Sequence, residues 1–181
     1  MSEVWLNEPP SWERKGARVS VRTGPDTDFW RRTHYGFVRD NGHFLALGRG
    51  EDVVARVDID GDYVDHYDQA GLMLRIDEER WLKCGVEYVD GSRLASAVVT
   101  DRYSDWSVAP LPKEGVVGFE LRREGGTILV SYRTGERSWT LLRVAPFPAG
   151  AADVGVMCAS PDGGGFDVRF IGIEIALAAD P

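Results

Sequence analysis

The chain has 181 residues, of which 43% are apolar and 28% charged, and its formal net charge is −8. These proportions are ordinary for a globular protein, and the length suits one domain, which we predict to span residues 1–181. The negative charge argues against a nucleic-acid partner, because such binding relies on Lys and Arg at the phosphates. We see neither an apolar run of roughly 18 residues nor the order of a secretory signal. We therefore expect a cytoplasmic protein without a membrane partner.

Strand-like patterns recur along the chain with turn signals between them, and none of the segments sustains a helical apolar stripe. In chain order, we expect strands at 17–23, 52–59, 69–76, 81–89, 93–101, 116–124, 127–134, 139–144, 153–159 and 166–177. The connections include sequences typical of hairpin turns, namely Asp60-Gly61, Asp90-Gly91, Gly125-Gly126 and Thr134-Gly135-Glu136. These patterns predict an all-β fold in which two antiparallel sheets pack as a sandwich.

The aromatic-rich stretch from Gly24 to Asn41 shows no strand pattern and is too long for a plain turn. We expect it to pack over an edge or an open face of a sheet. The segment SPDGGGFD at 160–167 is predicted to be a loop.

The two strands at 69–76 and 81–89 have an unusual second face. Leu72 and Leu74 must share the core side with Leu82 and Cys84, because side chains alternate along a strand. A three-residue loop at 77–79 satisfies this parity and sets Leu74 opposite Leu82. A five-residue loop would keep both faces but shift every pairing. In the first register, the other face pairs Arg75 with Trp81, Met73 with Lys83, Gly71 with Gly85 and Gln69 with Glu87.

The pair Gly71 and Gly85 leaves bare backbone, and glycine inside strands often marks the close approach of a ligand or of another chain segment. Both possibilities stay open: a ligand could lie there, or the face could carry the Trp30 segment. The next strand should continue the core with Ala95 and Ala97. The other face is then a shallow surface with Gln69, Lys83 and Glu87 as polar points.

Several motifs resemble the regulation-of-enolase-like family, also called domain of unknown function 1349. They are TDFWRRTHYGFVRDNGHF (27–44), YDQAGLMLRIDEERWLKCGVEY (67–88), YSDWSV (103–108), WTLLR (139–143) and GVMCASPDGGGFDVRF (155–170). The family belongs to the concanavalin A-like lectin and glucanase superfamily. The resemblance implies a jelly-roll sandwich whose concave sheet face can hold carbohydrate, and it implies no defined activity. The resemblance also implies that residues 63–68 form a turn.

The resemblance and the second face together suggest one set of ligand-binding residues. An indole offers an apolar surface to a sugar ring, and carboxylate or amide groups bind its hydroxyls. The candidates are Trp30, His34, Asp68, Gln69, Lys83, Glu87, Asp105 and Trp106.

The sequence motifs give little support for catalysis or for metal binding. Retaining glucanases of this superfamily carry a Glu followed by Asp two positions later, and no such pair exists here. Asp68 and Glu87 on neighbouring strands remain a possible hydrolase pair. The acidic run at 58–68 lacks the glycine and the terminal Glu of an EF-hand loop. A hairpin at Asp60-Gly61 would instead place Arg56 opposite Asp65. We name no catalytic residue, metal or cofactor.

Cys84 and Cys158 each lie inside a strand pattern, which predicts two buried free thiols, although a disulfide stays open.

The favoured function is a non-catalytic module that binds a saccharide or a small sugar-like metabolite. One alternative is a regulatory module that docks a protein partner through exposed aromatic residues such as Trp106. The other is a glycoside hydrolase that uses Asp68 and Glu87.

Overall fold

The computed structural model describes residues 4–177, which form two seven-stranded antiparallel sheets and a separate two-stranded hairpin. Sheet A contains, in spatial order, β1 (Val4–Leu6), β6 (His43–Gly50), β15 (Ala152–Ala159), β8 (Gln69–Arg75), β9 (Arg80–Val89), β10 (Ser92–Asp101) and β11 (Tyr103–Pro110). Sheet B contains β14 (Thr140–Pro146), β13 (Thr127–Thr134), β12 (Val117–Glu124), β7 (Val53–Gly61), β16 (Asp167–Leu177), β3 (Arg18–Arg22) and β2 (Ser11–Lys15). The hairpin consists of β4 (Phe29–Arg31) and β5 (Val38–Asp40).

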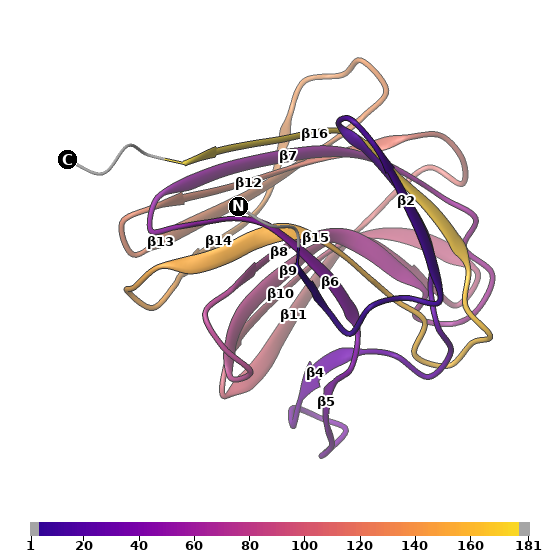
Figure 1. Ribbon diagram of the computed structural model, residues 1–181, viewed down its shortest axis with the longest axis horizontal. Coiled ribbons are helices and arrows are strands. Elements are labelled where there is room, and N and C mark those ends of the chain that lie inside the picture. Colours follow the sequence, from indigo (N-terminus) through magenta and orange to yellow (C-terminus); the bar gives the residue numbers. More distant parts are fainter. Residues whose placement is uncertain (1–3, 178–181) are drawn as a thin grey trace.

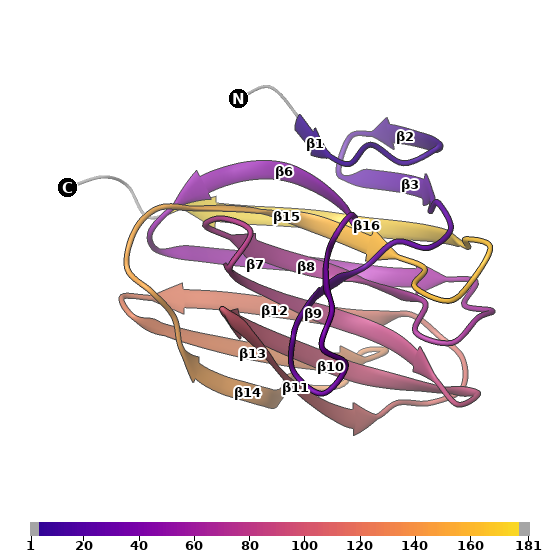
Figure 2. The ribbon, with the colours of Figure 1, turned by 90° about the horizontal axis from the view of Figure 1, so that it is seen from below.

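The two sheets lie face to face, and the β4–β5 hairpin lies on the side of sheet A that faces away from sheet B (Figure 1). The view from below shows the chain of this hairpin crossing the strands of sheet A (Figure 2). The predicted all-β jelly-roll sandwich of two antiparallel sheets is therefore confirmed. The described residues contain no helix, and hence none that could cross a membrane.

The core lies between the sheets, because alternate side chains of both sheets are apolar and point inward. Leu72, Leu82 and Ala97 of sheet A and Phe119 and Leu121 of sheet B are all fully buried in this layer. Strands β1, β2, β4, β5, β6 and β11 were not expected from the sequence.

The predicted register of β8 and β9 is confirmed. Leu74 lies opposite Leu82, and Gln69 lies opposite Glu87. The loop between the strands is the three-residue loop, whose Asp77 carboxylate accepts hydrogen bonds of 2.9 Å from the backbone N–H groups of Glu79 and Arg80. This turn therefore fixes the register of β8 and β9, in which the apolar side chains of both strands lie on the same face of the sheet.

The predicted hairpin at Asp60-Gly61 is wrong. β7 runs to Gly61 in sheet B, and the chain then crosses to sheet A, where β8 begins at Gln69. A Cβ on Gly61 would lie 2.6 Å from the ring of Tyr63, so this glycine makes room for an aromatic side chain rather than for a tight turn. Residues 63–68 form a turn, and Arg56 pairs with Glu120 at 2.6 Å instead of facing Asp65.

The two facing glycines exist because their strands come very close together. A Cβ on Gly71 would lie 1.8 Å from the carbonyl oxygen of Cys84. A Cβ on Gly85 would lie 2.0 Å from that of Ala70. Neither glycine is open to solvent, because both are buried. The Trp30 segment rests on this face of sheet A, which is the second of the two possibilities that the sequence left open.

Both cysteines are buried and free, as predicted. Burial raises the pKa of both thiols.

Candidate functional site

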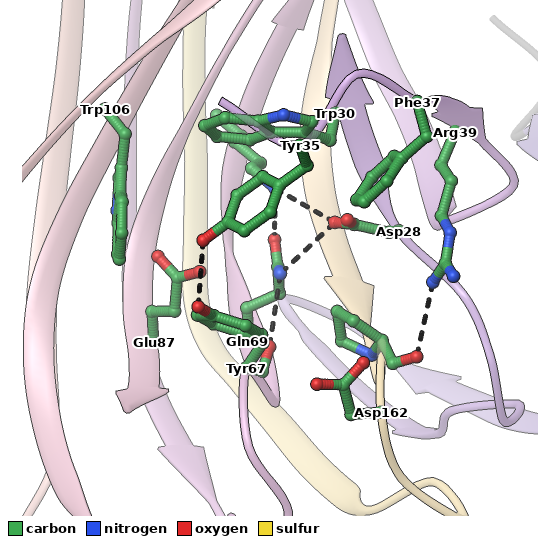
Figure 3. A pocket seen from close by; sticks show the side chains of 12 residues that line it. Asp28, Trp30, Tyr35, Phe37, Arg39, Tyr67, Gln69, Glu87, Trp106 and Asp162 are labelled. Carbon is green, nitrogen blue, oxygen red and sulfur yellow. Dashed lines mark hydrogen bonds and ion pairs between the residues drawn. The ribbon is translucent and has the colours of Figure 1, made fainter. Parts of the chain in front are cut away.

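A cavity of about 170 Å³ lies between the outer face of sheet A and the loops that cover it (Figure 3). The sheet supplies its floor, the β4–β5 hairpin one wall, and the turn at 62–68 with the loop at 160–166 the rim. It is lined by Asp28, Trp30, Tyr35, Phe37, Arg39, Tyr67, Gln69, Lys83, Glu87, Trp106, Pro161 and Asp162.

The β4–β5 hairpin is fixed to sheet A by apolar packing and by an ion pair. Phe29 and Trp30 form a small apolar cluster with Met73, Trp81 and other side chains of the sheet. Beside this cluster, the Arg75 guanidinium donates two hydrogen bonds of 2.8 Å to the two oxygens of the Asp40 carboxylate. This fork geometry restricts both side chains and holds the hairpin in one position over the sheet.

The floor of the cavity contains a buried ion pair. The Lys83 ammonium lies 3.4 Å from Asp28 Oδ1, donates at 2.7 Å to the carbonyl oxygen of Phe29, and donates to Gln69 Oε1. All three N–H bonds of the ammonium thus have acceptors. Gln69 Nε2 lies 3.4 Å from Asp28 Oδ1 and donates to the Tyr67 carbonyl at 3.1 Å. Lys83 therefore balances Asp28 and joins the hairpin to the sheet.

Glu87 is the buried carboxyl on the other side of the floor. Its Oε2 accepts a hydrogen bond of 2.6 Å from Ser96 Oγ, which in turn accepts one of 3.0 Å from Trp106 Nε1. Burial raises the pKa of Glu87, although the nearby Lys83 acts against this shift. The residue is 6% exposed, and Figure 3 shows its carboxyl in the wall of the cavity beside Trp106. Hydrogen bonding by the side chains of Ser96 and Trp106 also opposes the rise in the pKa of Glu87.

Two phenols join across the rim. The hydroxyls of Tyr35 and Tyr67 lie 2.9 Å apart, and this hydrogen bond, with burial, raises the pKa of Tyr67. Tyr67 has a φ of 67°, which is strained for an aromatic residue. Asp68 holds the turn in this form, because its Oδ2 accepts hydrogen bonds of 2.9 Å from the backbone N–H groups of Val64 and Asp65.

Aromatic rings follow one another around the cavity. The ring centroids of Trp30 and Tyr35 are 5.5 Å apart, and those of Tyr35 and Phe37 are 5.6 Å apart and stacked. Across the rim, Tyr67 lies edge-on to Trp106 at 6.3 Å. The wall is therefore apolar around a floor that carries charge.

The structure brings five of the eight predicted site residues together in this cavity. They are Trp30, Gln69, Lys83, Glu87 and Trp106. The other three lie elsewhere. His34 is an exposed loop residue whose ring packs edge-on against the outside of Tyr35 at 4.8 Å. Asp105 points away and pairs with Arg143 at 2.7 Å.

Asp68 is fully buried but does not line the cavity. Its Oδ1 accepts a hydrogen bond of 2.6 Å from Ser160 Oγ, and its Oδ2 caps the turn. The possible hydrolase pair of Asp68 and Glu87 is therefore not assembled in one cavity.

Sequence reasoning missed several residues that the β4–β5 hairpin and the loops contribute. They are Tyr35, Phe37, Arg39, Tyr67, Pro161 and Asp162. The density of aromatic residues between Gly24 and Asn41 was the available signal for the first three. The glycine-rich loop at 160–167 gave no comparable signal for Pro161 and Asp162.

Within residues 4–177, no group of three or more His, Cys, Asp or Glu side chains is arranged to hold a metal ion. The acidic run at 58–68 is engaged in other contacts. Asp58 pairs with Arg133 at 3.0 Å, and Asp60 and Asp62 pair with Arg169 at 2.9 and 3.2 Å.

The fold is a β-sandwich of the kind found in lectins and glycosidases. A solved structure of the carbohydrate binding module CBM66 from Bacillus subtilis shares this fold, with a TM-score of 0.62 at 12% identity over 94% of each chain. The chain itself belongs to the family described as "Protein of unknown function (DUF1349)", whose model matches residues 5–177.

A curated protein sequence and a crystal structure from Saccharomyces cerevisiae each match most of the chain. The chain is 42% identical over 170 residues to the protein named "Regulation of enolase protein 1", with 92% of this chain and 85% of that one covered. A crystal structure of a functionally unknown yeast protein has a TM-score of 0.91 at 38% identity, with 98% of this chain and 97% of that one covered.

Proposed function

We propose that this protein binds a saccharide or a small sugar-like metabolite in the cavity of about 170 Å³, without catalysing a reaction on it. The observation that carries the proposal is the combination of two indoles, Trp30 and Trp106, with the buried carboxyl of Glu87 in one small enclosure. A sugar presents apolar C–H faces, which pack on aromatic rings, and hydroxyl edges, which bond to carboxylates.

The size of the cavity favours a small ligand. Drug-sized molecules occupy pockets of roughly 300 to 1,000 Å³, and the cavity of about 170 Å³ is smaller than this range. This is the space for one sugar unit or a metabolite of similar size, with any further units outside the rim.

The carboxyls around the cavity favour binding over hydrolysis. Glycoside hydrolysis uses two carboxyls on opposite sides of the scissile bond. Asp28 is already engaged with Lys83 and Gln69, and Asp162 is an exposed loop residue at the rim. Among residues 4–177, no second free carboxyl therefore lies beside Glu87 in the interior of the cavity. The fold shared with a carbohydrate binding module supports the same assignment.

Calorimetry with a panel of monosaccharides and disaccharides tests the proposal. We expect at least one saccharide to bind with a Kd in the millimolar range or below, and binding to be lost in Trp106→Ala. The matched control is Trp139→Ala, because Trp139 is an exposed indole on another part of the surface. Absence of binding by every sugar, with the wild-type protein folded, would overturn the proposal.

A second candidate is a regulatory module that binds a protein partner. Leu141 and Val144 on the edge strand β14 are 58% and 54% exposed, and exposed apolar residues on an edge strand favour association. The name of the 42% identical yeast relative also refers to regulation. Trp106 does not suit the role of an exposed anchor, because it is half-buried and bonded to Ser96. A partner that is lost on Leu141→Asp and kept on Trp106→Ala would support this candidate, and a monodisperse protein without any partner would count against it.

A further inference from the structure

The wall of the cavity is unusually rich in aromatic rings for its size. Five of its twelve lining residues are aromatic, namely Trp30, Tyr35, Phe37, Tyr67 and Trp106. The faces of such rings carry partial negative charge and attract cations, which is how aromatic cages bind ammonium groups. A neutral sugar needs only one or two of these surfaces. The number of rings therefore indicates a ligand whose binding is strengthened by contact with several rings at once.

The cations of the cavity are already occupied. Lys83 directs its three N–H bonds to Asp28, the Phe29 carbonyl and Gln69. Arg39 lies over the Phe37 ring at 5.0 Å and donates to the Pro161 carbonyl at 3.3 Å. Neither side chain is directed at a ligand in the interior.

The carboxyl of Glu87, in contrast, has no cation of its own. Within the described part of the chain, it takes part in no ion pair, and the groups that donate hydrogen bonds to it, the Ser96 hydroxyl and the Trp106 indole, are uncharged. Lys83 is close enough to influence it but is bonded to Asp28 and Gln69 instead. A buried carboxylate without a counter-charge is unfavourable, so a positive group that entered the cavity would gain a partner at Glu87.

We infer that the ligand carries a protonated amine, which pairs with the Glu87 carboxylate and lies among the ring faces of the cavity. The inference deepens the proposed function, on which its sugar part rests: the saccharide is an amino sugar with a free ammonium group. Neutral sugars and N-acetylated sugars can fill the same space, but they cannot supply the charge.

The binding should depend on pH with a definite sign. Burial raises the pKa of Glu87, and an ammonium favours its ionised form. As pH falls through the raised pKa, Glu87 takes up a proton and affinity for the ammonium drops. The other titratable or charged groups that face this carboxyl are Lys83 and Asp28 on the floor, Tyr35 and Tyr67 at the rim, Arg39 on β5 and Asp162 in the loop at 160–166. Lys83 and Asp28 already form an ion pair, and the hydrogen bond with Tyr35, together with burial, raises the pKa of Tyr67.

The test is calorimetry with four probes at about pH 6.5 and about pH 4.5, where a sugar amine is protonated. The probes are glucosamine, glucose, N-acetylglucosamine and tetramethylammonium. We expect glucosamine to bind at least about tenfold more tightly than glucose at the higher pH, and we expect this advantage to shrink at the lower pH. The wild-type pH dependence needs no variant, so it remains informative if a variant fails to fold.

Glu87→Gln should remove the advantage of glucosamine over glucose, because glutamine keeps the hydrogen bond from Ser96 but carries no charge. The matched control is Glu136→Gln, which changes an exposed carboxylate elsewhere. Equal affinity for glucose and glucosamine would overturn the inference and leave the proposed sugar function intact. Binding of tetramethylammonium without any sugar would support the cation site and overturn the sugar function. No binding by any probe would overturn both.

Discussion

Gly71 and Gly85 lie directly opposite each other in the pairing of β8 with β9, and neither position has room for a Cβ. The obstacle in each case is a main-chain oxygen, which cannot move without shifting the strand. We predict that Gly71→Ala lowers the free energy of unfolding by at least about 3 kcal/mol, measured by urea denaturation. Gly164→Ala is the control, because a Cβ on this residue would meet no atom within 4 Å. A loss below about 1 kcal/mol in Gly71→Ala would contradict the close approach of the strands.

The second prediction concerns the buried ion pair between Lys83 and Asp28, whose side chains are 6% and 10% exposed. Lys83→Met leaves the Asp28 carboxylate buried without a counter-charge and should cost about 3 to 5 kcal/mol of stability. The double variant Lys83→Met with Asp28→Asn removes the orphaned charge and should recover part of this loss. Urea unfolding at neutral pH measures both. Equal stability of the single variant and the wild type would show that the pair does not hold the hairpin.

The third prediction follows from the raised pKa of Glu87. The folded state favours the protonated carboxyl, so its contribution to stability is fully present below the unfolded pKa of about 4.3 and is lost as pH rises through the folded pKa. Glu87→Gln resembles the protonated form and should melt at a higher temperature than the wild type at pH 7. The difference should vanish near pH 4. A lower melting temperature at pH 7 would contradict the burial of an unpaired carboxylate.

His43 should give the opposite pH dependence. Its Nε2 accepts a hydrogen bond of 2.9 Å from the Gly24 backbone N–H, and Nδ1 lies 2.6 Å from the Asn7 carbonyl, so the ring is held neutral. Burial lowers the pKa of His43. Stability from this residue is therefore present above the unfolded pKa of about 6.5 and is lost as pH falls toward the folded value. In thermal melts from pH 7.5 to 5, His43→Gln should lack this loss, and the same loss in both proteins would contradict the assignment.

The sequence predicted the parts of the fold that depend on alternation and on local turns. The alternation of apolar residues predicts which side chains of β8 and β9 face the core. The length of the loop at 77–79 then selects one register of the two strands. The Asp60-Gly61 prediction failed because glycine serves two purposes. It can supply the backbone of a tight turn, or it can make room for a neighbouring ring, as Gly61 does for Tyr63. A single sequence does not distinguish these purposes.

The sheet side of the candidate site was predictable from alternation, whereas on the hairpin only Trp30 was predicted, through the family resemblance. Gln69, Lys83 and Glu87 share one face of two paired strands, which alternation reveals. The rim depends on how loops from distant parts of the chain fold over that face. The hydrogen bond between Tyr35 and Tyr67 joins residues that are 32 positions apart. The chain between them contains three strands: β5 of the hairpin, β6 of sheet A and β7 of sheet B. Nothing local in the sequence specifies that meeting.

The most direct test of the central claim, that the cavity binds a sugar-like ligand, is an NMR titration of the indole N–H signals with glucose, N-acetylglucosamine and glucosamine. The Trp106 indole N–H is bonded to Ser96, which is bonded to Glu87, so a ligand at the carboxyl must change its environment. We predict saturable shifts of the Trp106 and Trp30 signals with at least one of these sugars, while the signal of the exposed Trp139 stays in place. Unchanged Trp106 and Trp30 signals at saturating sugar, or shifts confined to Trp139, would contradict the claim.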